Sequence, residues 1–417
     1  MKSGKQTARA GPANDSGPRL GLGMIISRLL PFGKRDESRI QALSGLFSKA
    51  EVDELGYLIK SRKARFSTNG LNVSKSLLDA PDYLLLAPNL TDARTLSRIE
   101  HYNGRLLSAA RDAAFEKFSA VAGERILALI APNIVGRESL KLAALLQLFA
   151  SEKVHVLLLG DPSTGKTVVL RSVAELAPIS SFGLGSGASK AGLTVMVSGK
   201  EVVKGILPLA DGGIACIDEL NLMKSQDLAG LLNAMEKGFI TYDKGNSHLR
   251  IDSRVRVFAS ANPVGDKFVG KTVQALRKQI PFNNALLSRF SLVFLIRRPD
   301  VDEFLKISQK IISGGRDKPA GEADLAFIRD YISHALSLEV KFDQALGARI
   351  QEFVRQIKKD EAQFLVGISP RTVAGIVNLA KASARMRLSG SASREDVEKA
   401  ISLVRDSLYL KKSDLDS

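Results

Sequence analysis

The residues best suited to chemistry lie between Val154 and Thr167, where the sequence is VHVLLLGDPSTGKT. An apolar run leads into the pattern G-x-x-x-x-G-K-[ST], whose glycines let successive backbone N–H groups face nucleotide phosphates at the positive end of a helix. Lys166 adds a mobile charge, and the Thr167 hydroxyl is placed to hold Mg²⁺. The pattern predicts binding of ATP and Mg²⁺. The residues predicted to hold the nucleotide are Gly160, Asp161, Pro162, Ser163, Thr164, Gly165, Lys166 and Thr167.

Two adjacent carboxylates follow a second apolar run. Residues 213–219 have the sequence GIACIDE, which predicts a buried strand with Asp218 and Glu219 at its carboxyl end, where α/β sheets bind ligands. Asp218 can bind nucleotide-associated Mg²⁺, and Glu219 can polarise the water that attacks the γ-phosphate. The alternative is an acidic pair that only begins a surface helix. The P-loop upstream favours the catalytic interpretation.

A polar residue ends a third apolar run. The predicted strand from Arg254 to Ala261 is followed by Asn262 and Pro263. An amide at the tip of a strand beside the P-loop strand can donate a hydrogen bond to the γ-phosphate or to the attacking water, which makes Asn262 a candidate catalytic residue. An Asn-Pro pair alone indicates only a turn. The order P-loop, acidic pair, polar strand tip resembles that of AAA+ ATPases.

The elements that position these groups follow from the hydrophobic pattern. Between Ile134 and Arg298, β-type runs alternate with helical segments, which predicts a parallel sheet covered by helices. Beyond Asp302 the pattern is helical throughout. Before the sheet, apolar residues recur at helical spacing and predict a small, mostly helical region. The predicted strands are 154–159, 214–217, 255–261 and 292–296.

We therefore predict an α/β fold in four parts. Residues 1–19 are rich in Gly, Ser, Ala and Pro and are expected to form a disordered basic tail. A small, mostly helical N-terminal domain covers 20–125, the ATPase core covers 126–300, and a helical lid covers 301–417.

Composition narrows the classes of partner. The chain has 417 residues and a formal charge of +16, which favours a polyanionic partner such as nucleic acid. No apolar run reaches the roughly 18 residues that cross a bilayer, so we expect an intracellular protein with no membrane partner. Cys216 is the only cysteine and is expected to be a small buried hydrophobe. With four histidines and no Cys-His spacing, no zinc site is expected.

Five stretches carry a further pattern, namely 130–136, 142–149, 209–219, 261–263 and 286–290. Together they resemble the minichromosome maintenance (MCM) helicase family, and the similarity covers about residues 126–410. The resemblance implies an AAA+ core with helices on both faces of a parallel sheet, two β-hairpin insertions, and a helical lid. It also implies a homo-oligomeric ring, with six subunits expected, whose ATP sites lie between subunits.

Two arginines receive roles from this resemblance. In the family, the arginine of the Ser-Arg-Phe motif reaches the γ-phosphate held by the neighbouring subunit, and Arg289 matches that arginine finger. Arg371, in the sequence Ser-Pro-Arg-Thr-Val, matches the second sensor, which MCM rings also supply across the interface. Either arginine alone is equally consistent with a surface residue. With the P-loop they imply ATP hydrolysis at subunit interfaces.

Two insertions also match the family. The runs 195–197 and 202–207 predict a hairpin that resembles the helix-2 insert. The runs on either side of Gly245 and Asn246 resemble the presensor hairpin, whose tip lysine faces the channel and contacts phosphates of single-stranded DNA. Lys244 matches that lysine. The alternative for Lys244 is a solvated hairpin lysine.

The sequence also departs from the family pattern. MCM P-loops carry Ala or Ser before the lysine and Ser after it, where this chain has Gly165 and Thr167. The usual Phe-Asp-Lys after the glutamate is replaced by Leu-Asn-Leu at 220–222, so an acidic group is lost. About 125 residues precede the core and contain no cysteine. We expect no zinc motif there, a reduced or missing oligonucleotide-binding barrel, and no winged-helix domain after the lid.

The first functional hypothesis is an ATP-driven DNA helicase or translocase that works as a ring. Two alternatives stay open. One is a remodelling ATPase that acts on protein, like the MoxR-type and magnesium-chelatase-type ATPases, which share both insertions. The other is an MCM-like DNA-binding factor without processive unwinding. Stimulation of ATP hydrolysis by single-stranded DNA distinguishes the helicase from the protein remodeller.

Overall fold

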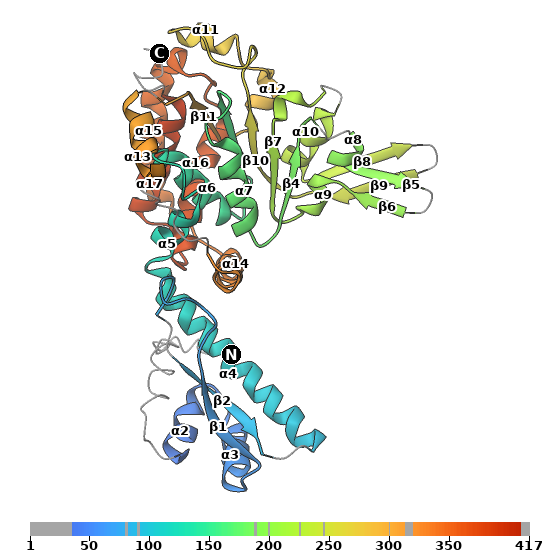
Figure 1. Cartoon of the computed structure of the whole chain (residues 1–417), viewed down its shortest axis with the longest axis vertical. Coiled ribbons are helices and arrows are strands. Elements are labelled where there is room, and N and C mark those ends of the chain that lie inside the picture. The colour runs from blue at the N-terminus through green and yellow to red at the C-terminus, as the bar shows by residue number, and fades with distance from the viewer. Residues whose placement is uncertain are drawn as a thin grey trace, which may run out of the picture. The chain divides into compact units, whose positions relative to one another are not determined.

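A computed structural model describes most of the chain (Figure 1). The described residues are 36–79, 82–89, 92–186, 190–198, 201–224, 227–244, 247–299, 301–312 and 320–409. The predicted tail, 1–19, lies outside them, as do residues 20–35 and 410–417. The chain divides into two compact units, one up to Phe118 and one from Ser119 onward, and each is described by itself. The predicted domain boundaries at residues 125 and 300 stay predictions.

The first unit combines helices with a pair of antiparallel strands. Ser48 caps the helix α3, where its backbone N–H donates to Glu51 at 2.8 Å. The strands β1 and β2 pair with Ala64 opposite Pro88. The sequence pattern did not predict this pair, because a short apolar run such as YLLLAP fits a helix or a strand equally well. The elements are α2 (Asp36–Ala42), η1 (Leu43–Gly45), α3 (Lys49–Lys60), β1 (Ala64–Asn69), β2 (Tyr83–Pro88) and α4 (Ala93–Ser119).

The second unit is built on a parallel sheet of five strands in the order β11-β3-β10-β7-β4. The three central strands are buried along their whole length, as expected for a sheet covered on both faces. Four strands match the predicted runs, whereas β4, which is rich in Ser and Gly, was not predicted. The strands are β3 (Val156–Gly160), β4 (Ser180–Leu184), β7 (Ile214–Asp218), β10 (Arg256–Ala261) and β11 (Leu292–Ile296).

This strand order brings the candidate site together. The P-loop strand β3 pairs with β10, and β10 pairs with β7. Their carboxyl ends are therefore neighbours at one edge of the sheet. The P-loop, the acidic pair and Asn262 each follow one of these ends.

Helices and hairpins surround the sheet. Both predicted hairpins are present and extend from the same side of the sheet in Figure 1. The hairpin strands are β5 (Val195–Ser198), β6 (Glu201–Lys204), β8 (Phe239–Lys244) and β9 (Ser247–Asp252). The helices are α5 (Ala122–Leu129), α6 (Glu138–Leu148), α7 (Lys166–Leu176), α8 (Lys190–Leu193), α9 (Ile206–Leu209), η2 (Leu220–Leu222), α10 (Leu228–Lys237), α11 (Val273–Arg277) and α12 (Asn284–Leu287).

The described residues after the sheet are mainly helical, as predicted. The helix α16 begins with Ser369 as cap and Pro370 in its first turn, packs on α17 and reaches α6. The predicted α/β fold with two hairpin insertions and a helical C-terminal region is confirmed. Within the described residues, no helix is long and apolar enough to cross a membrane. The helices are α13 (Val301–Ile312), α14 (Glu322–Leu336), η3 (Gln344–Leu346), α15 (Gly347–Lys359), η4 (Glu361–Gln363), α16 (Pro370–Met386) and α17 (Arg394–Leu408).

Candidate ATP site

The P-loop forms one wall of a cavity of about 490 Å³, a volume in the usual range for small ligands. The loop joins the end of β3 to the start of α7. Gly165 has φ +85°, and a Cβ there would lie 2.6 Å from Ile134 Cδ1. A Cβ on Gly160 would lie 2.1 Å from the Ile296 carbonyl oxygen. Both positions therefore require glycine, as the sequence pattern predicted.

Lys166 is held inside this loop. The residue is 7% exposed, and its Nζ donates hydrogen bonds to the carbonyl oxygens of Gly160 at 2.8 Å and Asp161 at 2.5 Å. Burial lowers the pKa of Lys166 to about 8, although Asp161, Asp218 and Glu219 act in the opposite direction. The ammonium group is thus held next to the space where phosphates would lie.

The eight predicted P-loop residues divide into two groups. Pro162, Ser163, Thr164, Gly165, Lys166 and Thr167 line the cavity. Gly160 and Asp161 are not among its lining residues. The Asp161 carboxylate instead accepts backbone hydrogen bonds from Phe268 at 2.8 Å and Arg298 at 3.2 Å, so it anchors the loop to neighbouring segments.

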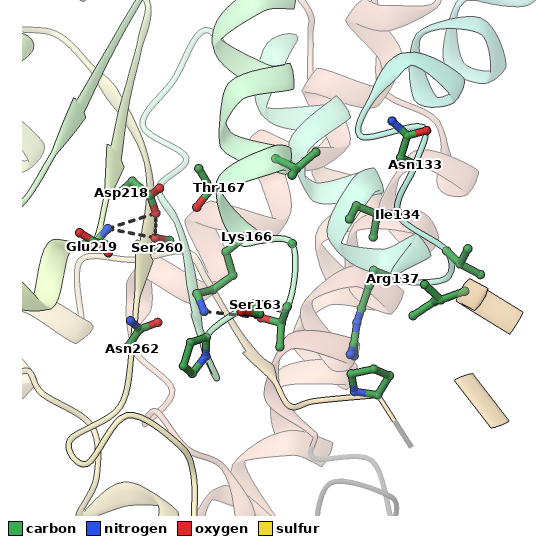
Figure 2. Close-up of a pocket in the computed structure, with 17 residues that line it drawn as sticks. Asn133, Ile134, Arg137, Ser163, Lys166, Thr167, Asp218, Glu219, Ser260 and Asn262 are labelled. Carbon is green, nitrogen blue, oxygen red and sulfur yellow. Dashed lines mark hydrogen bonds between the residues drawn. The ribbon is translucent and has the colours of Figure 1, made fainter. Parts of the chain in front are cut away.

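The acidic pair lies on the other wall. Figure 2 shows Asp218, Glu219, Ser260 and Asn262 on one side of Lys166. Asp218 is 4% exposed and accepts hydrogen bonds from the Ser260 hydroxyl and, at 3.2 Å, from the Glu219 backbone N–H. Glu219 adopts the left-handed conformation, with φ +54°. The structure thus brings Lys166, Thr167, Asp218, Glu219 and Asn262 to one cavity.

The far wall was not predicted as part of the site. Asn133, Ile134 and Arg137 line it, on the opposite side of the P-loop from the acidic pair in Figure 2. Arg137 donates from Nη2 to the Arg297 carbonyl oxygen at 2.8 Å. The motif at 130–136 contributed to the family resemblance, but nothing in its spacing showed that it faces the cavity. This wall can accommodate the nucleoside part of ATP.

The residues present fit Mg²⁺ bound together with a nucleotide. The Asp218 carboxylate and the Thr167 hydroxyl line the same cavity and offer the hard oxygen ligands that Mg²⁺ prefers. Ser260 was also not singled out from the sequence. A lone serine in an apolar strand gives no signal until strand pairing places it beside Asp218.

The two predicted arginines lie elsewhere. Neither Arg289 nor Arg371 is among the described residues that line the cavity. Both contact Glu236, near the end of α10: Arg289 Nη2 lies 2.5 Å from Oε2, and Arg371 Nη2 lies 3.8 Å from Oε1. Arg371 also donates from Nη1 to the Ser288 carbonyl oxygen at 3.2 Å. The hydrogen bond from Arg289 holds the pKa of Glu236 below its usual value.

The predicted DNA-binding residue lies at the end of a hairpin strand. Lys244 is the last residue of β8, and its backbone pairs with that of Ser247 in β9. Gly245 and Asn246, between them, lie outside the described residues. A DNA contact of Lys244 stays a prediction.

Taken together, the P-loop, the acidic pair on a nearby strand, the polar strand tip and the helical lid define a P-loop protein of the AAA+ class. Comparison with protein families makes the assignment narrower. The MCM P-loop domain matches residues 114–314, and the MCM AAA-lid domain matches residues 326–408. The two matches together cover more than half of the chain. The chain therefore belongs to the minichromosome maintenance family.

Proteins with similar sequences are named as MCM proteins or as DNA replication licensing factors. The minichromosome maintenance protein MCM of Saccharolobus solfataricus is 28% identical over 310 residues, which cover 68% of this chain and 44% of that protein. The DNA replication licensing factor MCM4 of Drosophila melanogaster is 30% identical, over 68% of this chain and 36% of that protein. The DNA replication licensing factor mcm7-B of Xenopus laevis is 31% identical, over 68% and 43%. The chain therefore spans less than half the length of these relatives.

Proposed function

We propose that this protein is an ATP-driven DNA helicase or translocase of the MCM type, with ATP and Mg²⁺ bound between the subunits of a homo-oligomeric ring, expected to be a hexamer. The observation that carries the proposal is the separation of the site into two parts. Lys166, Thr167, Asp218 and Glu219 share one cavity, whereas Arg289 and the lid's Arg371 lie outside it on Glu236. A second copy of the chain can bring these arginines to the first copy's γ-phosphate.

Each residue has a chemical part in this reaction. Lys166 and the P-loop N–H groups bind the phosphates, and Mg²⁺, when bound, neutralises charge on the phosphate oxygens. Glu219 accepts the proton of the attacking water, and Asn262 orients that water or the γ-phosphate. Arg289 and Arg371 of a neighbouring copy stabilise the charge that develops on the transferred phosphoryl group.

The proposed substrate is DNA inside the cell, in single-stranded or forked form. Two named relatives are DNA replication licensing factors, and the formal charge of +16 suits a polyanion. Lys244, at the end of β8, is the residue proposed to contact the phosphate backbone.

The test is ATP hydrolysis with and without single-stranded DNA at low salt, for the parent protein and for Lys244→Ala. We expect stimulation in the parent and little in the variant. The slope of log affinity for DNA against log salt should fall by about 0.7 for each Lys244 that engages a phosphate. Arg250→Ala is a matched control, because it removes a positive charge from the same hairpin where Arg250 lies over the Phe239 ring at 3.9 Å.

Two results would redirect the proposal. A parent protein that hydrolyses ATP without DNA stimulation would favour the protein-remodelling ATPase. A parent that binds DNA and hydrolyses ATP but does not separate a forked duplex would favour the MCM-like DNA-binding factor without processive unwinding.

A further inference from the structure

Ser260 occupies an unusual place in the sheet. It lies in β10, is 1% exposed, and pairs in register with Leu158 of the P-loop strand. On its other side, the register between β10 and β7 pairs Ala259 with Ile217, which leaves Ser260 beside Asp218. The hydroxyl therefore lies between the P-loop strand and the strand that carries the acidic pair, at the floor of the cavity that it helps to line.

The hydroxyl contacts both acidic residues in different ways. Ser260 Oγ donates to Asp218 Oδ1 and accepts the Glu219 backbone N–H at 3.1 Å, as the dashed lines in Figure 2 show. The Glu219 N–H also reaches Asp218 Oδ1, at 3.2 Å. These three groups form a closed hydrogen-bonded triangle at the ends of two strands.

This triangle fixes the direction of the Asp218 carboxylate. Both described donors contact the same oxygen, Oδ1. With Oδ1 held in this way, Oδ2 is the oxygen left for Mg²⁺ or its waters. A carboxylate ligand binds a metal more tightly when a hydrogen bond fixes its orientation in advance.

The same triangle acts on the backbone of Glu219. A residue other than glycine at φ +54° keeps that conformation only where its surroundings specify it. Here the Glu219 N–H is bound on the inner side by Ser260, and the Gly185 N–H donates to the preceding carbonyl oxygen, that of Asp218, at 2.7 Å. The direction of the Glu219 side chain thus depends partly on Ser260.

We propose that Ser260 is a positioning residue that sets the Mg²⁺-facing oxygen of Asp218 and the backbone of Glu219 together. The proposal rests on the proposed function of the same cavity and deepens it. Ser260 does not touch the phosphates in this role. It acts through the two carboxylates beside it.

The test is Ser260→Ala, measured by the Mg²⁺ dependence of binding of a slowly hydrolysed fluorescent ATP analogue. We expect the Mg²⁺ midpoint to rise about tenfold, the effect typical of losing a hydrogen bond to a metal ligand, while binding of the analogue in EDTA stays at the parent's value. The rate of ATP hydrolysis at saturating Mg²⁺ should also fall, because Glu219 is less well oriented.

Ser253→Ala is the matched control. Ser253 is fully buried just before β10, and its hydroxyl has no hydrogen-bond partner among the described residues. The Ser253→Ala variant should leave the Mg²⁺ midpoint unchanged. If Ser260→Ala fails to fold, Ser260→Cys keeps the volume with a much weaker hydrogen bond and should raise the midpoint in the same direction.

Two outcomes overturn the proposal: a Ser260 variant with the parent's Mg²⁺ midpoint, or equal shifts in the Ser260 and Ser253 variants, which would indicate a general packing effect. The titration needs no DNA. If the Mg²⁺ midpoint of Ser260→Ala is shifted but DNA does not stimulate ATP hydrolysis by the parent, the role of Ser260 is supported and the proposed helicase is contradicted. If the midpoint is unshifted and DNA does stimulate hydrolysis, only the role of Ser260 is contradicted.

Discussion

The cavity and the arginine pair are two halves of one proposed site, and they are held in different ways. In the cavity, Lys166 and Asp218 are 7% and 4% exposed and are fixed by backbone carbonyls and by Ser260. In the other half, the side chains of Arg371 and Glu236 are 44% and 47% exposed, whereas that of Arg289 is 17% exposed. The fold of one chain is sufficient to shape the cavity. The arginines are held by an exposed acid, a contact that adds little stability and can be exchanged for another anion.

This difference teaches where a partner is needed. Buried groups that are already ordered lose little entropy when ATP binds, which suits the task of holding the nucleotide. Arg289 and Arg371 both contact an exposed carboxylate. They can exchange it for a more highly charged group, and a γ-phosphate is such a group. The comparison gives three predictions, from the largest expected effect to the smallest.

The largest effect on ATP hydrolysis should come from inactivating the cavity in one variant and the arginine side in another. Lys166→Ala should abolish tight ATP binding, and Arg289→Ala should bind ATP yet hydrolyse it about 10³-fold more slowly, as for loss of an arginine finger. An equal mixture of the two variants should recover up to about a quarter of the parent's rate, because some interfaces then pair an intact cavity with an intact arginine. The measurement is steady-state ATP hydrolysis across mixing ratios.

The control for this experiment is each variant mixed with itself at the same total concentration, which should show no recovery. Sedimentation that finds a monomer with the parent's full ATPase activity would contradict the division of the site between two copies.

The second prediction compares one acid from each half. Glu219→Gln should bind ATP as the parent does but hydrolyse it about 10²-fold more slowly, because the amide cannot accept the proton of the attacking water. Glu236→Gln, the same change on the arginine side, should slow hydrolysis less than about tenfold, since it removes only an exposed ion pair. Single-turnover hydrolysis measures both. Equal rates for Glu219→Gln and the parent would show that another group is the base.

The smallest effect is a pH dependence confined to the cavity. Burial lowers the pKa of Lys166 to about 8, so its ammonium loses a proton as the pH rises through that value. ATP affinity should be about tenfold lower at pH 9 than at pH 7, since about one lysine in ten then keeps its charge. Lys166→Arg, which does not titrate in this range, should bind more weakly but with a flat profile. The same fall in Lys166→Arg would assign the effect to another group.

How much the sequence could predict depends on the range of the interaction. The P-loop is local, so its spacing was sufficient to predict that Gly160 and Gly165 must be glycine and that Lys166 lies within the loop, although Gly160 does not line the cavity. Asn262 and Glu219 came from the order of apolar runs along the chain. Arg289 received its role only from the family resemblance, because an isolated arginine has no local signature.

Other features depend on pairing between distant segments. Ser260 meets Asp218 only through the register of β10 and β7, and Arg137 reaches the cavity wall only once the sheet is formed. The strand β4 was missed because Ser180, Ser181 and Gly183 do not form an apolar run. A single sequence does not contain the register of its strands in readable form.

The position of Glu236 in the chain has one more consequence. Glu236 lies at the end of α10, and after Gly238, with φ +77°, the strand β8 begins at Phe239. Glu236, which contacts both arginines, is therefore only three residues before the first residue of the strand that ends at Lys244. In the proposed ring, a displacement of the hairpin by moving DNA would reach Glu236, and with it the arginines that serve the adjacent copy, through three peptide units.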